Sequence, residues 1–348
     1  MSPTQPRILL IYTGGTIGMI ENPVTRALEP FDFTHLIDNV PKMKMLNYRI
    51  DNISFEPPID SSDMNPQHWV DITRAIEQNY DKYDGFVVLH GTDTMAYTAS
   101  ALSFMLENLR KPVIITGSQL PIGEVRTDGE ENLITAVQIA AARTSDGEPM
   151  VQEVAILFED YLWRGNRATK RSADNFNAFK SHNYPELAKI GLGINFHEEA
   201  LMRHSHSPHT PLKSYCNLNT SVMVIDLFPG LRPDILRHQL ATPGVKGIVL
   251  KTYGAGNAPT AQWFTEAVKE AVERGVVVLN VTQCVNGSVS RRYAAGNALA
   301  CAGAISGGDM TTEAALTKLM FLFGAGYTPR RVSELLGVSL RGEITLHP

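Results

Sequence analysis

The chain has few cysteines and no excess of positive charge, and these shortages exclude several classes of protein. Only three cysteines occur in 348 residues, and their wide spacing predicts neither a disulfide framework nor a metal-binding knuckle. A formal net charge of -5 gives no electrostatic basis for binding nucleic acid. No apolar run approaches the ~20 residues that cross a membrane, and no signal peptide is recognisable. We therefore expect a cytoplasmic protein without a membrane or nucleic-acid partner.

The remaining composition is that of a folded protein with a sizeable core, since hydrophobic residues make up 43% and charged residues 19% of the chain. Short apolar runs alternate with amphipathic segments, and this alternation predicts an α/β fold. The predicted strands include 85–89, 112–116, 154–158, 222–227, 247–250 and 276–281.

The alternation continues on both sides of a polar, proline-bearing segment, so we expect two domains with mainly parallel sheets. The larger, flavodoxin-like N-terminal domain is predicted at 1–205 and a smaller α/β domain at 220–348. The linker between them is predicted at 206–219. Its histidines have no carboxylate or cysteine partner at the spacing of metal ligands, and we predict no metal site.

An apolar strand at 8–12 runs straight into a glycine-rich turn that contains Thr16. Gly14, Gly15 and Gly18 allow backbone N–H groups to approach a ligand closely. The spacing matches neither a phosphate loop nor a dinucleotide loop. A hydroxyl beside unpaired N–H donors suits attack on a carbonyl carbon, and a threonine that only caps the turn is the alternative.

Two more turns carry hydroxyl groups where a strand is expected to end. Ser61 and Ser62 precede a predicted helix, and Thr92 and Asp93 follow the buried strand 85–89. Each is also a common helix cap when considered alone. Because ligands bind beyond the carboxyl ends of parallel strands, we expect these turns to lie at the same edge of one sheet as Thr16.

Lys170 ends a polar segment, 164–170, that follows the strand 154–158. Most lysines are solvated, so this residue alone indicates little. Close to Thr92 and Asp93, a desolvated lysine serves as a base.

The chain resembles the bacterial-type L-asparaginases, and within them the type I, cytoplasmic branch, from residue 8 to about residue 343. This resemblance is carried by the runs 13–17, 90–94 and 169–170, with further similarity at 60–64 and 253–259. It implies hydrolysis of L-asparagine to L-aspartate and ammonia, without a metal or an organic cofactor. Selectivity against glutamine is left open.

The resemblance also implies catalytic roles. Thr16 is expected to be the nucleophile, and Thr92, Asp93 and Lys170 the second catalytic group, with Lys170 drawing the Thr92 proton. Backbone N–H groups near Thr16 and Thr92 are expected to form the oxyanion hole. An acyl-enzyme and direct attack by water both stay open.

For substrate binding, the resemblance implies that Ser61 and Ser62 hold the α-carboxylate and that Thr92 and Asp93 contribute, Asp93 at the α-ammonium group. Asn257 and Tyr293 match positions that relatives contribute from a neighbouring subunit. We therefore expect a homodimer or a homotetramer with a shared site.

One departure concerns the loop 21–30, a predicted lid with two prolines, in which many relatives carry a tyrosine bound to the nucleophile. No tyrosine occurs there in this chain. Tyr293 is our candidate for a substitute.

Two other functions fit parts of the pattern. The asparaginase-like subunit of a tRNA-dependent amidotransferase normally has an extra N-terminal domain, for which we expect no room before Thr13. A non-catalytic amino-acid sensor would keep Ser62 and Asp93 for binding but has no need to keep Thr16, Thr92 and Lys170 together.

Overall fold

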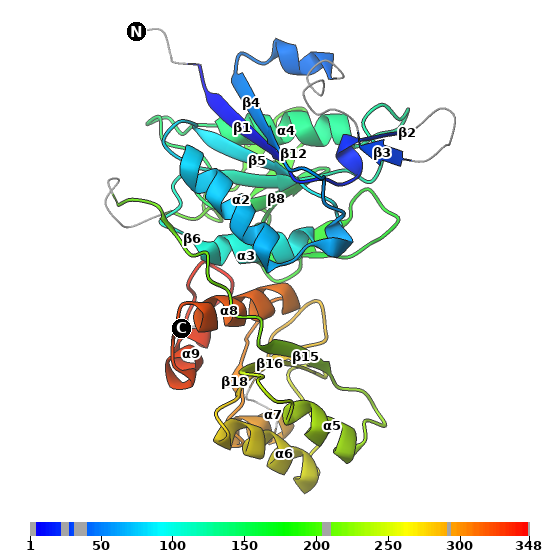
Figure 1. Ribbon diagram of the computed structural model, residues 1–348, viewed down its shortest axis with the longest axis vertical. Coiled ribbons are helices and arrows are strands. Elements are labelled where there is room, and N and C mark those ends of the chain that lie inside the picture. The colour runs from blue at the N-terminus through cyan, green and yellow to red at the C-terminus, as the bar shows by residue number, and fades with distance from the viewer. Residues whose placement is uncertain (1–4, 22–27, 31–39, 204–209, 291–293, 347–348) are drawn as a thin grey trace. The chain divides into compact units, whose positions relative to one another are not determined.

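The protein forms two compact units, Met1–Cys216 and Asn217–Pro348 (Figure 1). The structure is a computed structural model that describes residues 5–21, 28–30, 40–203, 210–290 and 294–346. Each unit contains a sheet with helices packed on it, which confirms the predicted class of two α/β domains with mainly parallel sheets. Within the described residues, no helix combines the length and the apolar character needed to cross a membrane.

The N-terminal unit is built on an eight-stranded sheet with the order β13-β12-β9-β8-β7-β5-β1-β4. Its strands are β1 (Arg7–Tyr12), β4 (Arg49–Ser54), β5 (Gly85–Leu89), β7 (Val113–Thr116), β8 (Val154–Phe158), β9 (Tyr161–Arg164), β12 (Ala188–Ile190) and β13 (Ile194–Phe196). Five neighbouring strands of the sheet are parallel, namely β4, β1, β5, β7 and β8. The strands β9, β12 and β13 extend the sheet in antiparallel pairs. The parallel strands therefore have the flavodoxin-like order, with the first strand between the second and the third.

Helices cover both faces of this sheet, which explains why its central strands are apolar throughout rather than alternating. The helices are α2 (Pro66–Asn79), α3 (Met95–Met105) and α4 (Gly129–Ala141). In Figure 1, α2 and α3 lie on one face and α4 lies on the other. Leu133 and Val137 of α4 pack with Leu10 and Tyr12 of β1, and every residue of β5 is buried.

Asp128 immediately precedes α4, a position typical of a helix cap, but its side chain makes no capping hydrogen bond. Its backbone is already in the helical region, and its carboxylate accepts N–H bonds from Gln119 at 3.0 Å and Leu120 at 3.1 Å. The hydroxyl of Thr127 accepts the N–H of Gly129 in its place, at 2.9 Å. Burial raises the pKa of Asp128, which organises the loop after β7 rather than the helix.

Short strand pairs complete the N-terminal unit: β2 (Met19–Glu21) with β3 (Leu28–Pro30), β6 (Leu106–Glu107) with β14 (Lys213–Ser214), and β10 (Ala168–Lys170) with β11 (Phe179–Ser181). The backbone of the predicted lid thus begins and ends in the β2–β3 pair, and residues 22–27 lie outside the described residues. Part of the predicted linker, β14, pairs within this unit; the predicted domain boundaries stay a prediction.

The C-terminal unit holds a four-stranded parallel sheet in the order β15-β16-β17-β18. Its strands are β15 (Val222–Asp226), β16 (Gly247–Thr252), β17 (Val277–Thr282) and β18 (Ile305–Ser306), and its helices are α5 (Pro233–Leu240), α6 (Gln262–Glu273), α7 (Ala294–Cys301), α8 (Thr312–Gly324) and α9 (Pro329–Leu336). A fully buried ion pair with a 2.5 Å separation joins Lys318 of α8 to Glu343 near the end of the chain.

Candidate active site

The two central strands β1 and β5 end side by side, at the position where the strand order of the sheet reverses. Tyr12 lies opposite Leu89 in the parallel register. Thr13 then donates both its N–H, at 3.0 Å, and its hydroxyl, at 2.9 Å, to the carbonyl of Leu89. The turns that carry Thr16 and Thr92 therefore leave the sheet together at its carboxyl edge, where ligands of such sheets bind.

Two glycines bring the turns into backbone contact. Gly15 has a φ of 90°, and a Cβ added there would lie 2.4 Å from the amide nitrogen of Gly91. No side chain fits between the two turns at this point. Thr16 and Thr92 directly follow these glycines, and both threonines are half-buried. The structure thus brings together the two turns whose hydroxyl groups the sequence predicted at one sheet edge.

Tyr12 holds the turn that carries Thr16 through a hydrogen bond to its backbone. The sequence did not predict this role. Its hydroxyl donates to the carbonyl of Gly18 at 3.2 Å, and burial raises the pKa of Tyr12 to about 12. A Cβ at Gly18 would lie 2.3 Å from that hydroxyl oxygen. The single 3₁₀ turn Thr16–Gly18 therefore rests on a buried phenol.

Lys170 reaches the second turn from the end of β10. Its Nζ atom lies 2.9 Å from Thr92 Oγ1 and 2.7 Å from Asp93 Oδ1. The lysine side chain is 18% exposed, whereas that of Asp93 is 65% exposed, so the ion pair opens to solvent on the aspartate side. The predicted grouping of Thr92, Asp93 and Lys170 is present in the structure.

Ser61 and Ser62 differ sharply in their surroundings. Ser61 is buried, and its Oγ accepts the N–H of Asp93 at 3.3 Å while its carbonyl accepts the Thr94 hydroxyl at 2.7 Å. Among the described residues, no acceptor takes the hydroxyl proton of Ser61. Ser62 is exposed and donates its N–H and its hydroxyl to Asp60, which lowers the pKa of that carboxyl.

Gln119 is a further polar group at the cluster that the sequence did not single out. Its Oε1 lies 3.4 Å from Thr92 Oγ1 and accepts a hydrogen bond from the Thr92 hydroxyl. Its Nε2 donates to the carbonyls of Ala173 at 3.2 Å and Asn175 at 3.1 Å. Gln119 thus connects Thr92 to the loop that follows Lys170.

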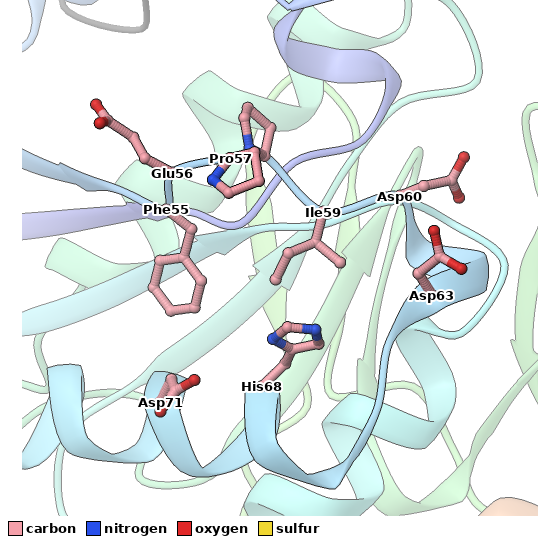
Figure 2. A pocket seen from close by; sticks show the side chains of 9 residues that line it. Phe55, Glu56, Pro57, Ile59, Asp60, Asp63, His68 and Asp71 are labelled. Atoms are coloured by element: carbon pink, nitrogen blue, oxygen red, sulfur yellow. The ribbon is translucent and has the colours of Figure 1, made fainter.

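A cavity of about 520 Å³ lies beside this cluster, between the segment that precedes Ser61 and the first turns of α2. Figure 2 shows Phe55 and Ile59 on one side and His68 and Asp71 on the other. Its lining carboxylates are Glu56, Asp60, Asp63 and Asp71. This acidic lining does not suit a substrate carboxylate, and none of the clustered catalytic candidates lines the cavity.

The C-terminal unit carries Asn257, at the end of the turn that follows β16. The Asn257 N–H donates to the Tyr253 carbonyl at 2.7 Å. Its side-chain oxygen is buried and has no hydrogen-bond partner among the described residues. Tyr293 lies outside the described residues. Nor do the described residues contain a group of three or more histidine, cysteine or acidic side chains that could hold a metal ion.

Comparisons with known proteins match both units. The family described as "Asparaginase, N-terminal" matches residues 7–202, and "Glutaminase/Asparaginase C-terminal domain" matches residues 221–336. The chain is 43% identical to L-asparaginase 1 of Escherichia coli (strain K12), over 97% of this chain and 98% of that protein. It is 39% identical to the 60 kDa lysophospholipase of Mus musculus, over 98% of this chain and 63% of that protein. The crystal structure of L-asparaginase I from Vibrio cholerae superposes with a TM-score of 0.89 at 41% identity, covering 99% of this chain and 100% of that one.

Proposed function

Since the chain belongs to the asparaginase family through both of its units, we propose that it is an amidohydrolase that converts L-asparagine to L-aspartate and ammonia. The observation that carries this proposal is the contact of Lys170 with Thr92 and Asp93, next to the turn that presents Thr16. Amide hydrolysis needs a nucleophile, a group that moves protons and donors for the oxyanion, and this edge of the sheet supplies candidates for all three.

Thr16 is the nucleophile in this proposal. Its Oγ forms a bond to the side-chain amide carbon and gives up its proton to Thr92, which passes its own proton to Lys170, and backbone N–H groups of the two turns bind the oxyanion. The carbon–nitrogen bond then breaks, and the nitrogen takes up the proton from Lys170 through Thr92 and leaves as ammonia. Water hydrolyses the resulting ester, which releases L-aspartate and restores the Thr16 hydroxyl.

Lys170 moves protons through Thr92. In the absence of substrate, its ammonium group donates to both Thr92 and Asp93. Asp93 binds the α-ammonium group of the substrate, which places a second cation beside Lys170. In this proposal the amine of Lys170 accepts the proton that Thr92 gives up.

Ser61 and Ser62 hold the α-carboxylate of the substrate. Ser61 is suited to this role because its Oγ already accepts the Asp93 N–H, so that its own proton is available for an anion. Asn257 and Tyr293 complete the site from a neighbouring subunit, and the active form is a homodimer or a homotetramer. The enzyme acts in the cytoplasm and uses no cofactor.

Ammonia release from L-asparagine by the purified protein tests the function, with L-glutamine as the comparison substrate. Thr16→Ala and Thr92→Val should each lower kcat by roughly 10² or more with the fold intact. Near-normal turnover in either variant contradicts the assignment of that residue. A protein that binds asparagine without releasing ammonia is a sensor instead, and release only in the presence of a charged tRNA and a partner indicates the amidotransferase function.

A further inference from the structure

A buried chain of hydrogen bonds ends at the turn that carries Thr92. His90 is completely buried, and its Nδ1 lies 2.6 Å from the carbonyl oxygen of Gly91. Its Nε2 lies 2.9 Å from Thr98 Oγ1 on α3. The indole Nε1 of Trp69 on α2 donates to the same hydroxyl at 2.9 Å. This chain of hydrogen bonds therefore joins α2 and α3 to the turn that carries Thr92.

The two ends of this chain determine the direction of every bond in it. The indole N–H of Trp69 can only donate, and the carbonyl of Gly91 can only accept. Because the Thr98 hydroxyl accepts from Trp69, its proton is available for Nε2 of His90. That nitrogen is then the unprotonated one, and Nδ1 carries the proton that Gly91 accepts. Burial also lowers the pKa of His90 to about 4, in agreement with a neutral ring.

We propose that His90 is a positioning residue that sets the orientation of the Gly91–Thr92 peptide, and thereby aims the Thr92 N–H at the substrate oxyanion. In a trans peptide, the C=O and the N–H point in opposite directions. Since His90 holds the Gly91 carbonyl toward the interior, the Thr92 N–H points away from the imidazole. That N–H has no partner among the described residues, unlike the Asp93 N–H, which is bound to Ser61. The proposal rests on the proposed function, which supplies the oxyanion.

Two substitutions at position 90 separate the two ends of the ring. In His90→Asn, the side-chain amide can place an N–H near the position of Nδ1 and keep the bond to Gly91. In His90→Gln, the amide reaches the position of Nε2, near Thr98, and leaves the Gly91 carbonyl without its donor. Loss of one oxyanion donor costs about 10²–10³ in kcat. We expect His90→Gln to lose about 10² in kcat with KM and product inhibition by L-aspartate nearly unchanged, and His90→Asn to stay within about tenfold of the parent protein.

Thr73→Val is the control for lost buried hydrogen bonding, because Thr73 is fully buried on α2 and donates to the Trp69 carbonyl at 2.8 Å. It should lower Tm without changing kcat. Equal kcat in the Asn and Gln variants, or kcat losses that follow Tm in all three proteins, overturn the positioning role.

The ¹⁵N spectrum of the histidine side chains gives a readout that does not depend on turnover. We expect a protonated Nδ1 and an unprotonated Nε2 for His90, and the opposite tautomer overturns the proposal. If the parent protein releases no ammonia from asparagine, the proposed function fails, and the spectrum still decides whether His90 donates to Gly91.

Discussion

The Nζ atom of Lys170 lies 2.9 Å from Thr92 Oγ1, although 78 residues separate the two in the chain. The segment that delivers the lysine is itself buried, since Arg164, Asn166 and Arg167 have 5%, 0% and 2% exposure. Arg164 forms a buried ion pair with Glu153, 2.6 Å apart. Packed neighbours on the N-terminal side of Lys170 thus hold the segment that delivers the amine.

Replacing Lys170 with methionine keeps the length of the side chain and removes the amine. We expect Lys170→Met to lower kcat by about 10² or more, because proton transfer through Thr92 loses its acceptor. Lys189→Met removes an exposed lysine of β12 and should leave kcat unchanged. Steady-state ammonia release measures both, with circular dichroism to verify folding. A Lys170→Met protein as active as the control would show that another group moves the proton.

The two serines before α2 should respond differently to substitution by alanine. Ser61→Ala removes both the acceptor of the Asp93 N–H and a donor to the substrate carboxylate, so we expect KM to rise and kcat to fall. Ser62→Ala removes only exposed contacts and should raise KM with little change in kcat. Identical kinetic constants for the two variants would contradict the distinction between a buried and an exposed serine.

A site shared between subunits predicts recovery of activity in mixtures. Thr16→Ala and Asn257→Ala should each be nearly inactive alone. After subunit exchange, half of the dimers are mixed, and half of the sites in each mixed dimer are intact. Activity should therefore return to about one quarter of the parent value. Exchange demonstrated by mass spectrometry without any recovery would place the whole site within one chain.

His90 makes stability depend on pH in a defined window. Its pKa falls from 6.5 in the unfolded chain to about 4 in the folded protein because burial disfavours the charged ring. Between these values the unfolded state binds more protons, so stability is full above pH 6.5 and is lost progressively as the pH falls toward 4. The total loss is about 3 kcal/mol.

Urea unfolding at several pH values between 7.5 and 4 measures this dependence. The pKa of His182 is lowered in the same direction, mainly by burial, so the parent protein alone does not isolate the contribution of His90. His90→Gln should be less stable at neutral pH but should show a shallower decline in the window. The same decline in both proteins would mean that His90 does not titrate there.

The sequence predicted the part of the site that follows from strand ends. Thr16 and Thr92 come directly after apolar parallel strands, and the carboxyl ends of such strands share one edge of the sheet. Ser61 was found for the same reason. Lys170 was proposed from the family resemblance, because its approach depends on the buried segment 164–168, whose polar sequence indicates an exposed loop.

The sequence did not predict the side chains that hold the site's turns and loops through hydrogen bonds to the backbone. In the sequence, Tyr12 and His90 stand at the ends of apolar strands. Their polar atoms bind the backbone carbonyls of Gly18 and Gly91, and these contacts exist only in the folded structure. Asp128 lies at a position typical of a helix cap, but its carboxylate instead accepts two backbone N–H groups of the loop after β7. Local patterns place a side chain on an element, whereas its hydrogen-bond partner depends on which distant loop packs beside it.

The contact between Gly15 and Gly91 has a consequence for the order in which the protein assembles. Parallel strands pair only after the long chain segment between them has closed into a loop. The turn after β1 therefore gains its packing partner, the turn after β5, only when these two strands have paired. A chain that has formed helices but has not joined these strands holds Thr16 and Thr92 apart. During refolding, enzymatic activity should therefore return only after β1 and β5 have paired. Its return should lag behind the recovery of the helical circular dichroism signal.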